Sequence, residues 1–287
     1  MPLKIVPVIT PFINNVLDID LLRNHCETLL KSGIDKLFIA GTNGLGLSLN
    51  FNEKLKIIND LDIDGDKLIM QIGSLNLDES IELAMAAKKK EYFAISSVPP
   101  YYYSDLDADS IIRYFLDLSK YYRTIVYNYP RMTNHDVDSK MLEKIIKLGG
   151  NIIGIKDTVN DIMHMLEYKN INNDLIVLAG PSTHIFAALR AGVDGAVSAA
   201  GNYMPNIINY LYKNINSNDA FKFQILINKV INAAKPFGIY SANYSLVRLI
   251  KGYSCGYPRP PFYPLSETKE KELEKIIKNI LKNGDNI

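Results

Sequence analysis

A lysine stands at the end of one short apolar segment, where its amine could take part in chemistry. Residues 151–158 read Asn-Ile-Ile-Gly-Ile-Lys-Asp-Thr, and their β-branched side chains predict a fully buried strand that ends at Lys156. Side chains alternate along a strand, so Lys156 is expected to share a face with Gly154 and Ile152, and Ile153 to take the other. A desolvated amine has a lowered pKa and can attack a carbonyl carbon. The alternative is a lysine whose amine stays hydrated at the strand end.

Polar side chains that could assist such an amine follow other apolar segments. Gly41–Gly46 is a glycine-rich turn whose backbone N–H groups can face a carboxylate, and Thr42 and Asn43 add a hydroxyl and an amide. Tyr127 ends another predicted strand, where its phenol could relay protons, although a tyrosine at such a place is more often structural. Tyr101–Tyr103 follow two prolines, and for at least two of them we prefer a core or subunit contact.

Metal and dinucleotide sites are not expected. The four histidines are scattered and show no ligand spacing, and the chain has no His-x-x-His or Cys-x-x-Cys motif. The first predicted strand-to-helix turn has no Gly-x-Gly-x-x-Gly motif. The chemistry is therefore predicted to be metal-free and centred on an amine.

The elements that must position these residues are predicted strands and helices, which alternate regularly along the chain in eight repeats. The expected strands are Leu3–Ile9, Lys36–Ala40, Lys67–Gly73, Tyr92–Ser97, Thr124–Tyr127, Ile152–Lys156, Leu175–Ala179 and Gly195–Ser198. The expected helices between them are Asp20–Lys31, Asn52–Leu61, Leu77–Lys89, Asp109–Tyr121, Ser139–Leu148, Asp161–Tyr168 and Thr183–Ala191. This order predicts an α/β fold, a TIM (β/α)8 barrel, in which chemistry belongs at the carboxyl ends of the strands.

After the eighth strand the segments that look helical follow one another without strands. They are Pro205–Lys213, Asp219–Ala234, Ala242–Ile250 and Ser266–Leu281. The first can close the barrel, and the other three predict a C-terminal helical extension. We therefore expect a barrel over residues 1–215 and an appendage over residues 216–287, together one catalytic unit. The segment Gly256–Pro261 is too rich in proline to be helical.

Composition limits the partners and the compartment. A net charge of +1 gives no electrostatic reason to bind nucleic acid or an anionic membrane. The two cysteines, far apart in sequence, favour a reduced cytoplasm over a disulfide framework. The first residues lack the pattern of a signal peptide, and no apolar stretch approaches the roughly 18 to 20 residues of a membrane span. A soluble cytoplasmic protein is expected.

Four motifs in order resemble the superfamily of N-acetylneuraminate lyase and dihydrodipicolinate synthase, the pyruvate-dependent class I aldolases. They are Gly41–Gly44, Pro100–Tyr102, Tyr127–Pro130 and Gly154–Thr158. The similarity extends from Pro7–Phe12 to Gly256–Pro261. Within the superfamily the chain is most similar to the archaeal 2-keto-3-deoxygluconate aldolases, because of Gly44-Leu45-Gly46, the three tyrosines and the Pro-Arg-Pro-Pro tail.

The resemblance implies roles for these residues. Lys156 forms a Schiff base with the 2-keto carbon of a 2-keto-3-deoxy sugar acid, without a cofactor. Tyr127 takes the C4 hydroxyl proton as glyceraldehyde leaves the pyruvate enamine. Thr42 hydrogen-bonds Tyr127, Tyr102 reaches in from a neighbouring subunit, and the turn at Thr42–Asn43 holds the substrate carboxylate. The remaining pocket residues are Tyr129, Thr158, Gly180 and Val197. A homotetramer built from two dimers is also implied.

Several residues depart from the pattern of the relatives. Asp105 and Lys235 stand where aldolases that accept the phosphorylated sugar acid carry arginine, while Tyr129 is retained. A carboxylate repels a phosphate, so we expect a preference for the unphosphorylated substrate. Asn43 stands where most relatives have threonine, so the Asn43 amide is expected to make the contact to the substrate carboxylate instead.

The superfamily leaves other reactions open. Met132 stands where dihydrodipicolinate synthases have arginine, which counts against that activity, and a sialic acid lyase is the other alternative within the same chemistry. Ser182 and Ile239 replace polar groups of close relatives, so the contacts to the sugar hydroxyls and the selectivity between C4 epimers stay open. A barrel that only binds a keto acid or a partner protein is a third alternative. The joint presence of Lys156, Tyr127 and Thr42 argues against it.

Overall fold

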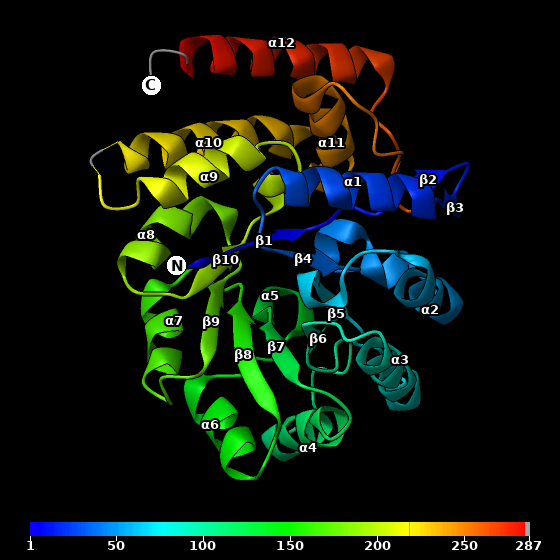
Figure 1. Ribbon diagram of the computed structural model, residues 1–287, viewed down its shortest axis with the longest axis vertical. Helices are drawn as coiled ribbons and strands as arrows, with labels where there is room; N and C mark the ends of the chain where they lie inside the picture. Colours follow the sequence, from blue (N-terminus) through cyan, green and yellow to red (C-terminus); the bar gives the residue numbers. More distant parts are fainter. Residues whose placement is uncertain (218, 285–287) are drawn as a thin grey trace.

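Eight parallel strands close into a barrel in the computed structural model (Figure 1). The structure describes residues 1–217 and 219–284. The hydrogen-bonded order is β1-β10-β9-β8-β7-β6-β5-β4, and β4 pairs with β1 to close the ring. The strands are β1 (Leu3–Pro7), β4 (Lys36–Ile39), β5 (Leu68–Gln71), β6 (Ala94–Ser97), β7 (Thr124–Asn128), β8 (Ile152–Asp157), β9 (Ile176–Ala179) and β10 (Gly195–Val197). The expected TIM barrel is confirmed.

Helices surround the strands. They are α1 (Ile19–Lys31), α2 (Phe51–Asp60), α3 (Leu77–Lys89), α4 (Ala108–Ser119), α6 (Ser139–Lys147), α7 (Ile162–Lys169), α8 (Ile185–Arg190) and α9 (Pro205–Lys213). Most of them begin where an aspartate or asparagine side chain accepts a hydrogen bond from a backbone N–H of the first turn, as Asp138 does from Met141. Sequence analysis missed the hairpin β2–β3 (Phe12–Ile13 and Val16–Leu17) and the helix α5 (Pro130–Thr133), which are too short to show a period.

The C-terminal helices form a further layer. They are α10 (Ala220–Ala234), α11 (Ile239–Leu246), which continues as a π-helical turn over Val247–Lys251, and α12 (Glu267–Gly284). α10 packs against α9, and α12 packs against α10 at the end of the molecule (Figure 1). α11 starts three residues before the expected Ala242. The division into residues 1–215 and 216–287 stays a prediction, and residues 218 and 285–287 lie outside the described part.

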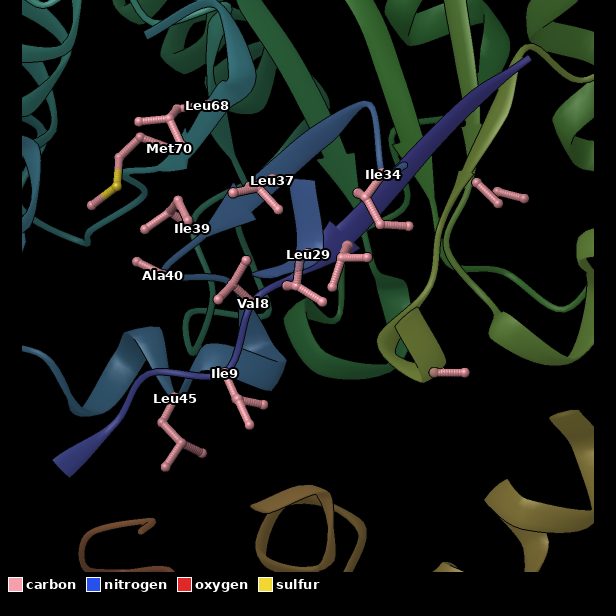
Figure 2. Close-up of a cluster of buried hydrophobic side chains, with 14 of the residues drawn as sticks. Val8, Ile9, Leu29, Ile34, Leu37, Ile39, Ala40, Leu45, Leu68 and Met70 are labelled. Atoms are coloured by element: carbon pink, nitrogen blue, oxygen red, sulfur yellow. The ribbon is translucent and has the colours of Figure 1, made fainter. Parts of the chain in front are cut away.

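The hydrophobic core has two shells. The larger one fills the space between strands and helices, and Figure 2 shows part of it at β4 and β5, with Leu37, Ile39, Leu68 and Met70 as sticks. The smaller one fills the interior of the barrel and includes Ile5, Phe38, Ile69, Ile125 and Leu178. Because side chains plug the interior, the barrel is a packed core, and a ligand site can open only where this inner shell ends.

One extra residue in β8 changes which side chains face inward. Thr124 of β7 pairs with Ile152, but the next residue, Ile125, pairs with Gly154. Ile153 packs against the inner shell and Ile152 against the outer one, so the expected grouping of Ile152 with Lys156, and of Ile153 with the opposite face, is wrong. The physical reason is the β-bulge, which interrupts the alternation of side chains.

The proline-rich tail is fastened to the barrel by Arg259. Its Nη1 and Nη2 donate to the two carboxylate oxygens of Glu53 at 2.6 and 2.7 Å, and its Nη2 also donates to the carbonyl of Ser48. The guanidinium lies 4.4 Å from the centre of the Phe12 ring. Both charged side chains are mostly shielded from water, with 13% and 19% exposed.

Arg259→Ala should therefore lower the free energy of unfolding by about 1–3 kcal/mol, because it leaves the Glu53 carboxylate shielded and unpaired. Urea denaturation with an unchanged m-value measures this. Lys278→Ala is the matched control, since it removes an ion pair to Glu274 whose lysine is 74% exposed, and it should have almost no effect. Equal effects of the two substitutions would contradict the prediction.

Candidate active site

A cavity of about 290 Å³ opens at the carboxyl end of the barrel. It is lined by all but one of the site residues expected from the sequence: Thr42, Asn43, Tyr127, Tyr129, Lys156, Thr158, Gly180 and Val197. These residues come from the ends of β4, β7, β8, β9 and β10. Sequence reasoning missed Arg131, Asn160, Tyr240 and Asn243, which also line the cavity. They lie on short helices, loops and the C-terminal layer. The expectation that functional residues follow the carboxyl ends of the strands therefore does not find them.

Lys156 is buried at the floor of this cavity. Its side chain is 3% exposed, and its Nζ lies 3.6 Å from the centre of the Tyr127 ring and 4.2 Å from that of Phe38. Aromatic faces attract an ammonium ion, whereas burial removes its hydration. Burial is the larger effect and lowers the pKa of Lys156 to about 7. About half of the amines are therefore neutral, and nucleophilic, at neutral pH.

Tyr127 lies beside Lys156 in the sheet register and is equally buried. Its hydroxyl is 3.1 Å from Oγ1 of Thr42, and its ring stacks on Tyr129 with the ring centres 5.9 Å apart. Burial raises the pKa of the Tyr127 phenol, and the hydrogen bond to Thr42 opposes this only in part. The phenol consequently keeps its proton at neutral pH and can share it with an oxygen of a ligand.

Two further contacts shape the pocket. Within the described residues, the buried Oγ1 of Thr158 has no hydrogen-bond partner, so it is available to a ligand. Gly180 lies against it, and a Cβ at position 180 would collide with that hydroxyl, which explains the glycine. Asn243 of α11 donates from Nδ2 to Oδ1 of Asn43 at 3.2 Å, so the Asn43 amide in the turn after β4 is held by the C-terminal layer.

Tyr102 does not line the cavity of its own chain. Its side chain is 78% exposed and packs edge-on against Tyr103, with the ring centres 5.4 Å apart. Its backbone has φ +81°, a conformation that costs a non-glycine residue roughly 1–3 kcal/mol. Asp105 in the same loop is also exposed and outside the cavity. A role for Tyr102 at Lys156 therefore requires a second subunit.

The described part of the chain offers neither a metal site nor a membrane-spanning helix. No group of three or more His, Cys, Asp or Glu side chains in residues 1–217 and 219–284 could hold a metal ion. No helix of the described segments is long and apolar enough to cross a membrane. His25, one of the scattered histidines, is a core residue bonded to Tyr253 and Asn202, and burial lowers its pKa to about 4.

The fold is a (β/α)8 barrel with a buried amine at the end of one strand. Such an amine, partly neutral at neutral pH, can form an imine with a carbonyl compound. Residues 3–280 match the profile of the dihydrodipicolinate synthetase family, and the chain belongs to this family. The resemblance expected from the motifs is thereby confirmed.

Relatives of this chain include two archaeal aldolases. The chain is 39% identical over 286 residues to the 2-dehydro-3-deoxy-phosphogluconate/2-dehydro-3-deoxy-6-phosphogalactonate aldolase of Saccharolobus solfataricus, covering 98% of this chain and 96% of the relative. It is 33% identical to the 2-dehydro-3-deoxy-D-gluconate/2-dehydro-3-deoxy-phosphogluconate aldolase of Thermoproteus tenax, over 95% of this chain and 90% of the relative. Its fold matches the Sulfolobus 2-keto-3-deoxygluconate aldolase in complex with D-KDPG with a TM-score of 0.92 and 37% identity, over 98% and 97% of the chains.

The lowered pKa predicts how the rate of chemical modification of Lys156 depends on pH. Modification by formaldehyde and cyanoborohydride, followed by peptide mass spectrometry, should reach half its maximal rate at about pH 7, because only the neutral amine reacts. Nα-acetyl-lysine is the reference, with a midpoint at about 10.4. A Lys156 midpoint near that of the reference would show that the amine is hydrated.

Proposed function

We propose that this protein is a class I aldolase that reversibly cleaves 2-keto-3-deoxygluconate to pyruvate and glyceraldehyde. The observation that carries the proposal is the buried Lys156 amine with a pKa of about 7, facing a cavity and flanked by the hydrogen-bonded pair of Tyr127 and Thr42. The names of the archaeal relatives support the same substrate class.

Each catalytic residue has a defined task in this proposal. The neutral Lys156 amine attacks the C2 ketone, and loss of water gives an iminium that withdraws electrons from C3. Tyr127 accepts the C4 hydroxyl proton and passes its own proton to Thr42, which releases its hydroxyl proton to water in the cavity, while the C3–C4 bond breaks and glyceraldehyde leaves. Protonation of the remaining enamine and hydrolysis of the imine release pyruvate and restore the amine. No cofactor takes part.

The rest of the pocket binds the substrate. Backbone N–H groups of the turn at Thr42–Asn43 receive the carboxylate, because the first N–H groups of a helical turn lack partners within that turn. The free hydroxyl of Thr158 donates to the substrate, and Gly180 leaves room for it. Val197 also lines the cavity.

The proposal also includes a homotetramer, a pair of dimers, in the cytoplasm. The exposed and strained Tyr102 supports an assembly in which a neighbouring chain brings this side chain to the Tyr127–Thr42 pair. The two cysteines, both free and buried, fit a reduced compartment.

Pyruvate trapping tests the function. Treatment with pyruvate and borohydride should add one pyruvyl group at Lys156, and Lys156→Ala should abolish the adduct. Tyr127→Phe should still form the adduct, but kcat for cleavage should fall about 10²–10⁴-fold because proton transfer is lost. An adduct on another lysine would refute the assignment, and pyruvate release from sialic acid alone would favour the lyase alternative.

The preferred substrate is a second prediction. We propose higher kcat/KM for 2-keto-3-deoxygluconate than for its 6-phosphate, because Asp105, in the same loop as Tyr102, would be brought to the cavity by a neighbouring chain of the proposed tetramer and would repel a phosphate. The competing candidate is an enzyme for the phosphorylated acid, favoured by Arg131 and Lys235 on the cavity wall and by the names of the relatives. A kinetic comparison of both acids and their galactonate epimers decides, and equal or higher kcat/KM for the phosphate would overturn the preference.

A further inference from the structure

A buried polar cluster lies behind the two proposed catalytic residues, on the outer side of the barrel wall. The residue after Tyr127 is Asn128, and the residue after Lys156 is Asp157. These two pair in the sheet and are both fully buried. Since side chains alternate along a strand, both point away from the cavity, toward His164 of α7.

Hydrogen bonds connect this cluster tightly. Asp157 Oδ1 accepts from Nδ2 of Asn128 at 3.1 Å and from the backbone N–H of Val159 at 3.2 Å. Asp157 Oδ2 accepts from Nδ1 of His164 at 2.9 Å. On the other side, Nε2 of His164 lies 3.3 Å from Oδ2 of Asp136, whose Oδ1 accepts from Asn128 at 2.7 Å. His164 thus lies between the carboxylates of Asp157 and Asp136, and the side-chain amide of Asn128 donates to both.

Protonation of His164 offsets one of the two negative charges in this cluster. A fully buried carboxylate such as Asp157 is costly without a counter-charge, and a second carboxylate at Asp136 adds repulsion. Asp136 first, and Asp157 next, raise the pKa of His164 to about 10. Tyr168 of α7 is a further titratable neighbour, and its ring meets that of His164 edge-on with the centres 5.2 Å apart. Burial raises the pKa of its phenol, so it contributes no charge at neutral pH.

The same strand ends carry the pocket. The carbonyl of Asn128 accepts from the N–H of Thr158 at 2.9 Å, and the carbonyl of Asp157 accepts from the N–H of Gly180 at 2.7 Å. Any shift of Asn128 or Asp157 therefore moves residues that line the cavity. A displacement of about 1 Å at a reacting centre can cost roughly 100-fold in rate.

We propose that His164 is a positioning residue for the reaction: its cation binds Asp157 and Asp136 and thereby fixes the ends of β7 and β8, which hold Tyr127 and Lys156 together. The proposal rests on the aldolase function proposed above. It has an electrostatic consequence as well. Without the cation, the Asp157 carboxylate, on the residue that follows Lys156, has no counter-charge, and the added negative charge should favour the charged ammonium, so that the neutral amine becomes scarcer.

The variant His164→Gln tests this, because glutamine retains hydrogen-bonding capacity but carries no charge. The full-length protein should keep its KM while kcat falls roughly 10–100-fold. The midpoint of Lys156 modification by formaldehyde should rise by roughly 0.5–1 pH unit. Met163→Gln, at an exposed neighbour on α7, is the matched control and should leave both quantities unchanged. Arg259→Ala, far from the cluster, controls for lost stability.

Unchanged kcat and midpoint in a folded His164→Gln protein would overturn the proposal, as would equal losses in Arg259→Ala. If His164→Gln does not fold, the wild-type imidazole decides: ¹⁵N NMR at pH 8 should show both ring nitrogens protonated, and a neutral ring there would overturn the proposal. The formaldehyde and NMR measurements need no substrate. If the wild type fails to trap pyruvate, the aldolase function fails, while these two measurements still report on the cluster.

Discussion

Desolvation of one amine is the constraint on which the site depends. A fall of the Lys156 pKa from 10.5 to about 7 corresponds to a free energy on the order of 5 kcal/mol in favour of the neutral form. Attraction to the rings of Tyr127 and Phe38, about 2 kcal/mol for a desolvated contact of this kind, favours the charged form. The packed interior of the barrel below the lysine therefore decides the outcome, because it keeps water away from the amine.

The C-terminal layer completes the cavity that the strands begin. Lys235, Ile239, Tyr240 and Asn243 line it from segments that follow the barrel. Asn243 is bonded to the turn after β4, and Arg259 fastens the tail to α2. The proposed catalytic residues Tyr127 and Lys156 stand on strands, whereas the outer wall stands on helices. This separation allows the wall to vary without disturbing the amine, which fits relatives named as a sugar-acid aldolase, a 4-hydroxy-tetrahydrodipicolinate synthase and an N-acetylneuraminate lyase.

Much of this site was predictable from the sequence, for a geometric reason. Alternating strands and helices imply a barrel, and a barrel brings the ends of all its strands to one edge, so Thr42, Tyr127 and Lys156 converge although they are far apart in the chain. The missing parts depend on packing. Arg131 lies on a helix of one turn, and nothing in the composition of Ile239–Leu246 indicates which face of α11 meets the cavity. His164 looked isolated because its carboxylate partners come together only in the fold.

The bulge in β8 has a consequence for the orientation of the whole strand. Ile152 enters the strand with its side chain toward the helices, and four positions later a regular strand would return to that same side. The amine of Lys156 would then point out among the helices. The extra residue changes the side of the sheet that the later residues face, so that Ile152 packs against the helices while Lys156 points into the cavity.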